Sequence, residues 1–150
     1  MSRVITFTDT ADLRTSPRRA FWFGVRPDAI ADVDPMVNSW QPQELPPRVG
    51  TENHMRTRVL GIPMKAVSRF VEFDPPHRFV LDGVRPLPAR WMRFIVTFDE
   101  LPNGETRFTY LMEIRYPVWG VLVARPMVLV MRRAMRTARR RMIEIFGEAA

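Results

Sequence analysis

The stretch VWGVLVARPMVLVMRRAMRTARRRMIEIFGEAA, residues 118–150, decides the fold of this chain. At about 100° per residue its arginines gather on one side and its methionines and small apolar residues on the other, which is typical of an amphipathic helix. It holds seven Arg against two Glu, whereas residues 1–117 hold 16 basic against 14 acidic side chains. Such a helix needs a broad apolar partner surface, which the preceding chain must supply.

The predicted helix has a basic face and an apolar face. The basic face covers an arc of about 120° and holds Arg125, Arg132, Arg133, Arg136, Arg139 and Arg140. The opposite face holds Met127, Val130, Met131, Ala134, Met135, Ala138, Met142 and Ile145. An arginine face that keeps the outer side hydrated is the ordinary interpretation of this charge. We therefore look for function on the methionine face.

Length and composition suit one domain over residues 1–150. With 46% apolar residues the chain can fill a substantial core, and the absence of Cys excludes disulfides, a thiol nucleophile and Cys-ligated zinc. Residues 1–9 lack the apolar segment of a signal peptide, and the longest mostly apolar run, residues 118–131, is too short to span a bilayer. We expect a cytoplasmic protein.

Upstream of the helix, strands dominate the pattern. Residues 4–8 alternate like a strand, and Ser16-Pro17 supplies an N-cap and a first-turn proline for a short helix over residues 18–23. A second short helix is predicted over residues 28–33. From residue 36 to residue 116, regularly spaced turn signals indicate an antiparallel meander.

The clearest turn signal is Asn103-Gly104, which predicts a tight hairpin between residues 90–99 and 106–116. The second of these strands alternates cleanly, with one apolar face made of Phe108, Tyr110, Met112, Ile114 and Tyr116. The first strand places Met92, Phe94, Val96 and Phe98 on one face. This apolar surface is the partner that the terminal helix requires.

Several local features together resemble one known family. They are Ser16-Pro17, Phe21 and Phe23 in the first helix, Trp40, Val49-Gly50-Thr51, the run EFDPPHRF at residues 72–79, and Pro126 within the terminal helix. With the order of elements, they resemble the START-like superfamily, specifically its polyketide cyclase/dehydrase branch, the SRPBCC proteins. The resemblance covers nearly the whole chain, and the Asp-Pro-Pro turn is its best single landmark.

The resemblance implies an α+β helix-grip fold. In such a fold a curved antiparallel sheet of about seven strands wraps around the long C-terminal helix, and two short helices follow the first strand. It also implies a cavity for an apolar or amphipathic small molecule. Members of the family bind lipids, sterols, polyketides or plant hormones, and a minority catalyse cyclisation or dehydration. Residues 1–150 would then form a single START-like ligand-binding domain.

Strand alternation and helix periodicity predict the lining of that cavity. The side chains on its expected inner faces are Met55, Thr57, Met92, Phe94, Val96, Phe108, Tyr110, Met112, Met127, Met131 and Met135. Methionine is flexible and polarizable, so a methionine stripe suits an adaptable apolar lining, although ordinary core packing explains it equally well.

Three residues are weak candidates for chemistry. Tyr110 lies in the middle of the apolar stripe, so its hydroxyl needs a partner, which is a side chain, water or a ligand oxygen. Arg90 shares the inward parity but begins its strand. His54 alternates with the apolar residues beside Arg56 and Arg58, which is more typical of a solvent face.

The sequence contains no established metal or cofactor motif. His54 and His77 lack a third ligand, and Asp28, Asp32 and Asp34 lie in and after a short helix, where acidic residues favour caps and turns. Sequences of the GxSxG, Walker and GxGxxG types are absent. We therefore predict neither a metal site nor a cofactor.

Three functional hypotheses follow. The first is binding, transport or sensing of a hydrophobic or amphipathic small molecule, and the second is catalysis of the polyketide aromatase/cyclase type. The third is peripheral contact of the basic helix with an anionic membrane, because its outer side also carries Val121, Leu122, Val128 and Leu129. Nucleic acid is the weakest partner, since no aromatic residues interleave the arginine run. The oligomeric state, monomer or homodimer, stays open.

Overall fold

The chain folds as a curved antiparallel sheet with one long helix and two short ones, as predicted. The computed structural model describes residues 2–59, 61–83, 91–118 and 121–149. The elements are β1 (Ser2–Leu13), α1 (Pro17–Gly24), α2 (Pro27–Val33), β2 (Val37–Pro42), β3 (Glu52–Val59), β4 (Ile62–Asp74), β5 (Arg78–Gly83), β6 (Trp91–Glu100), β7 (Thr106–Pro117) and α3 (Val121–Phe146). This architecture confirms the helix-grip fold.

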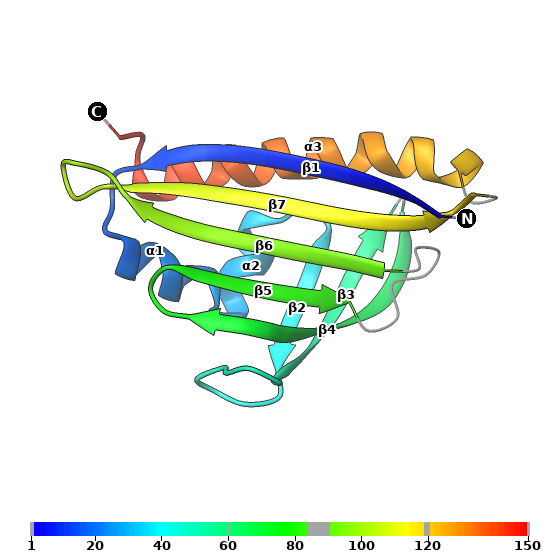
Figure 1. Cartoon of the computed structure of the whole chain (residues 1–150), viewed down its shortest axis with the longest axis horizontal. Coiled ribbons are helices and arrows are strands. Elements are labelled where there is room, and N and C mark those ends of the chain that lie inside the picture. Colours follow the sequence, from blue (N-terminus) through cyan, green and yellow to red (C-terminus); the bar gives the residue numbers. More distant parts are fainter. Residues whose placement is uncertain (1, 60, 84–90, 119–120, 150) are drawn as a thin grey trace.

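The sheet has the strand order β1-β7-β6-β5-β4-β3-β2. All neighbours are antiparallel, and the strand order places consecutive strands from β2 to β7 side by side, so these strands form a meander. Figure 1 shows α3 running lengthwise along β1 and β7, at the opposite side of the sheet from β2. The short helix α2 contacts both β2 and α3. The sheet, α2 and α3 therefore surround one interior.

The first strand is longer than the sequence predicts. We expected residues 4–8, but β1 pairs with β7 without interruption from Ser2 opposite Pro117 to Leu13 opposite Thr106. Its inward side chains include Phe7, Ala11 and Leu13, all of which are buried. The alternation of apolar and polar residues over residues 4–8 indicates the centre of this strand in the sequence. The additional residues at both ends are extended because they pair with β7.

The Asn103-Gly104 turn joins β6 and β7 as predicted, but the connection is not a two-residue turn. Residues 101–105 form it, closed by hydrogen bonds from the Leu101 amide to the Glu105 carbonyl (2.7 Å) and from the Gly104 amide to the Leu101 carbonyl (2.9 Å). Gly104 has φ of +82°, a conformation that suits glycine. The longer loop keeps Phe98 opposite Phe108, so the apolar faces of both strands stay aligned.

The apolar face of α3 is partly buried as predicted. Met131, Ala134, Met135 and Met142 are buried and the other predicted members, Met127, Val130 and Ala138, are half-buried, but Ile145 is 47% exposed. The expectation for Ile145 was wrong because Ile143 and Phe146, not Ile145, pack beside Met142 at this end of the helix. Among the described helical residues, no segment is both long and apolar enough to cross a membrane.

Candidate functional site

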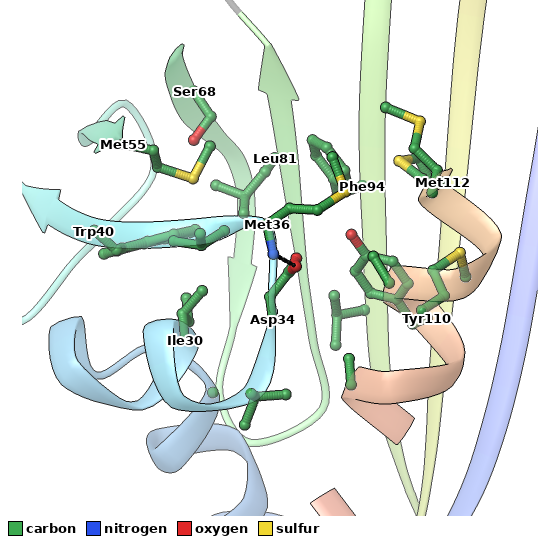
Figure 2. Close-up of a pocket in the computed structure, with 18 of the residues that line it drawn as sticks. Ile30, Asp34, Met36, Trp40, Met55, Ser68, Leu81, Phe94, Tyr110 and Met112 are labelled. Atoms are coloured by element: carbon green, nitrogen blue, oxygen red, sulfur yellow. Dashed lines mark hydrogen bonds between the residues drawn. The ribbon is translucent and has the colours of Figure 1, made fainter. Parts of the chain in front are cut away.

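The interior between the sheet and α3 contains a cavity of about 280 Å³. All eleven side chains that we assigned to a cavity from strand parity and helix periodicity line it. Sequence reasoning missed the contribution of α2, β2, the segment that joins them, β4 and β5, which together provide Ile30, Asp34, Met36, Trp40, Ser68 and Leu81. Figure 2 shows these side chains converging on the same space as Phe94, Tyr110 and Met112. The wall is mostly apolar, so its few polar groups determine how a ligand would be oriented.

Asp34 is the most informative polar residue that we did not predict as part of the site. It follows α2 directly, and its carboxylate accepts a hydrogen bond from the Met36 amide at 2.9 Å (Figure 2). Burial raises the pKa of Asp34, although the Met36 amide and the positive charge of Arg141 partly oppose this shift. A carboxyl group held in an apolar wall can accept a ligand's proton or, when protonated, donate its own.

The Tyr110 hydroxyl faces the same part of the cavity as Asp34 (Figure 2). Tyr110 lies on β7, and its ring packs against Phe94 with ring centroids 6.1 Å apart. Burial raises the pKa of Tyr110 well above its ordinary value, and the negative charge of Asp34 raises it further. The hydroxyl therefore stays neutral and can donate a hydrogen bond to a ligand oxygen.

The raised pKa of Asp34 predicts a stability difference that depends on pH. Because the native state holds the proton more tightly than the unfolded chain, the contribution of Asp34 is fully present below its unfolded pKa near 3.8 and is lost as pH rises through the folded pKa. Asp34→Asn should therefore be more stable than wild type at neutral pH, with a difference that shrinks towards about pH 3.

Urea denaturation across this pH range measures the effect. Asp32→Asn is the matched control, because Asp32 is exposed and lies in the helix that precedes Asp34. A constant difference between Asp34→Asn and wild type at every pH would show that the carboxyl group does not titrate differently in the folded protein.

Three further polar groups in the wall have no protein partner among the described residues. The Ser68 hydroxyl on β4, the Trp40 indole nitrogen on β2 and the Tyr116 hydroxyl on β7 are buried, and none forms a hydrogen bond there. All three residues line the cavity. Since a buried polar group without a partner is costly, these atoms suit water or a ligand atom as their partner. Strand parity did not identify Trp40, because β2 has only six residues and gives too little pattern.

The other candidates for chemistry lie elsewhere. His54 is exposed on β3, and His77 is exposed between β4 and β5; neither is among the described residues that line the cavity. Arg90 lies outside the described residues. Asp28 forms an exposed ion pair with Arg26 at 3.0 Å. The described residues contain no group of three His, Cys, Asp or Glu side chains arranged to hold a metal.

The arginines of α3 divide into an outer set and two that bind neighbouring elements. Five of them, Arg125, Arg132, Arg133, Arg136 and Arg140, are exposed. Arg139, although exposed, donates from Nε to the Thr10 carbonyl at 2.8 Å. Arg141, which lies outside the predicted basic arc, donates to the Asp32 and Val33 carbonyls at 3.3 and 3.5 Å. Arg141 therefore caps the end of α2 and places positive charge near Asp34.

The outer apolar residues of α3 only partly match the expectation. Leu122 and Leu129 are 86% and 67% exposed, whereas Val128 is half-buried and packs against the core cluster around Met131. The side chain of Val121 lies outside the described part of the chain. Contact with an anionic membrane through this side of α3 stays a prediction.

Solved structures share this fold. The di-domain ARO/CYC StfQ from the steffimycin biosynthetic pathway matches with a TM-score of 0.77 at 16% identity, over 96% of this chain and 51% of that one. The di-domain ARO/CYC BexL from the BE-7585A pathway matches with a TM-score of 0.74 at 22% identity, over 98% and 51%. This chain thus spans about half of each. Ginseng major latex-like protein 151 from Panax ginseng matches with a TM-score of 0.68 at 13% identity, over 95% and 97%.

The family assignment comes from the sequence. No curated protein gives a significant match. In contrast, the family model described as polyketide cyclase / dehydrase and lipid transport matches residues 4–149, which extend from the third residue of β1 to the segment after α3. The match therefore includes every strand and helix that forms the cavity. This chain belongs to the polyketide cyclase/dehydrase and lipid transport family.

Proposed function

We propose that this protein binds a hydrophobic or amphipathic small molecule in the cavity between the sheet and α3. The observation that carries the proposal is the combination of a methionine-rich and aromatic wall with a few polar groups inside it, Asp34 and Tyr110 foremost. Apolar surface supplies most of the affinity in such a site, and the polar groups fix the orientation of the ligand. Its oxygen-bearing end would lie against Tyr110 and Asp34.

Two features support binding of varied apolar shapes. Met127, Met131 and Met135 lie along the inner side of α3, and Met55, Met92 and Met112 face them from the sheet. Unbranched thioether side chains adapt to different ligands with little strain. The family description, which includes lipid transport, is consistent with such a role.

Replacement of Tyr110 by Phe tests the orientation. We expect Tyr110→Phe to weaken binding of prodan, an apolar fluorophore with a carbonyl oxygen, by about three- to tenfold, the range for one lost hydrogen bond. N-phenyl-1-naphthylamine, which has no oxygen, should bind unchanged. Thr109→Val is the matched control, since it removes a hydroxyl from the other face of β7. Equal loss of both probes, or of neither, would contradict a hydrogen-bonding role for Tyr110.

Catalysis of the cyclase type is the second candidate, and the Asp34–Tyr110 pair favours it. A carboxyl group with a raised pKa beside a neutral hydroxyl can move protons at an enolic carbon or oxygen. The resemblance of the fold to two ARO/CYC proteins supports the same possibility. Incubation with a linear poly-β-ketone separates the two functions by mass spectrometry. A bound ligand of unchanged mass and unchanged chromatographic retention indicates binding, and a cyclised or dehydrated product that Asp34→Asn prevents indicates catalysis.

A further inference from the structure

We propose that the groove between the free edge of β1 and α3 binds the anionic group of an amphipathic ligand whose apolar part occupies the cavity. The inference rests on the proposed function and specifies its ligand class as an apolar body joined to a carboxylate, sulfonate or phosphate. The groove is lined by Thr6, Phe7, Thr8, Asp9, Arg132, Met135, Arg136 and Arg139.

Three arginines on one side of α3 supply the positive charge. Arg132, Arg136 and Arg139 are four and three residues apart, so their side chains lie on one helix face. The Arg132 guanidinium lies over the Phe7 ring, 5.5 Å from its centroid, which holds it towards β1. Arg139 lies 3.6 Å from the Asp9 carboxylate. Arg132 and Arg136 form no ion pair with a described residue, so the groove keeps uncompensated positive charge.

The edge of β1 supplies backbone donors to the same groove. β1 is the terminal strand of the sheet, and the Thr10 carbonyl points away from β7 to accept from Arg139. In an uninterrupted antiparallel ladder, residues two and four positions away share this direction, so the amides and the carbonyls of Thr6 and Thr8 also point towards α3. The amides add hydrogen-bond donors to the guanidinium groups of Arg132 and Arg136, and charge-assisted donors of this kind recognise an anion.

The groove adjoins the cavity. Asp9, Met135 and Arg139 line both. Thr10 and Arg139 line the cavity and are nevertheless exposed, so the wall of the cavity reaches the surface between β1 and α3. A ligand could therefore keep its apolar part among the methionines and extend its charged end to Arg132 and Arg136.

Two matched probes test the inference on the full chain. The anionic 8-anilino-1-naphthalenesulfonate and the neutral N-phenyl-1-naphthylamine share an apolar body and differ by the sulfonate. We expect Arg132→Gln/Arg136→Gln to weaken the anionic probe about tenfold, as expected for lost charge-assisted contacts, and to leave the neutral probe unchanged. Arg125→Gln/Arg133→Gln removes the same charge from exposed positions of α3 outside the groove and should have little effect.

The outcomes separate this inference from the proposed function. If the neutral probe binds and both double variants weaken the anionic probe equally, the overall charge of α3 acts and the groove is not a site. If neither variant affects the anionic probe, the inference is also overturned, while binding in the cavity stands. Failure of the neutral probe to bind the wild-type protein would instead remove the proposed function and the inference with it.

Discussion

Replacement of Ala134 by Trp is expected to weaken binding of N-phenyl-1-naphthylamine about 5- to 150-fold, because forced overpacking of the ligand against the indole costs about 1–3 kcal/mol. Ala134 is buried on the inner side of α3 and lines the cavity. An indole at this position extends into a space of about 280 Å³ and occupies the volume that the ligand needs. The same space lets the protein accept the larger side chain with little loss of stability.

Calorimetric titration measures the effect, since the added Trp does not interfere with it. Leu129→Trp is the matched control, because Leu129 lies on the same helix and is 67% exposed. This control should bind the probe as the wild-type protein does. If Ala134→Trp keeps the circular dichroism spectrum and melting temperature of the wild type and also its affinity, the ligand binds outside this cavity.

The cavity wall could be predicted from the sequence where the elements are long and regular. In β7, alternate residues from Phe108 to Tyr116 face inward, and each parity assignment follows from a strand of twelve residues. In α3, the 3.6-residue period identifies Met127, Met131 and Met135 in the same way. These inward-facing positions follow from the geometry of a single strand or helix, so they can be predicted without knowing which other elements pack against it.

Asp34 and Arg141 could not be predicted because their surroundings come from distant parts of the chain. Asp34 follows a helix of only seven residues, and its sequence neighbourhood is that of an ordinary turn. It becomes half-buried because α2, β2 and α3 meet there, and Arg141 contributes its charge from more than 100 residues away. The one local signal for the burial of Asp34 is that the Asp34-Pro35 pair lies between the apolar residues Val33 and Met36. The orphaned Trp40 and Ser68 atoms likewise depend on which strands become neighbours.

Phe21→Ala should give the largest loss of stability in this protein, about 3–5 kcal/mol. Phe21 in α1 has no exposed surface, and its ring makes edge contacts with Phe73, Phe79 and Phe98 at centroid distances of 5.4, 5.7 and 5.5 Å. Removal of the ring loses the buried area, these three contacts and a fourth edge contact with Trp22 at 5.4 Å. Since the total stability of a domain is about 5–15 kcal/mol, the change consumes a large fraction of it.

Trp22→Ala is the matched control, because Trp22 is the next residue of α1 and is 37% exposed. It contacts Phe21 and Phe73 with centroid separations of 5.4 and 6.1 Å, so some loss is expected, but less than for the fully buried Phe21. Urea denaturation of both variants compares the two free energies of unfolding. Equal losses of stability would mean that full burial of the Phe21 ring contributes no more than the partly exposed Trp22 ring.

The space left by Phe21 adjoins the cavity wall, because Phe79 and Phe98 line the cavity as well. A bound apolar probe should therefore restore more stability to Phe21→Ala than to Trp22→Ala.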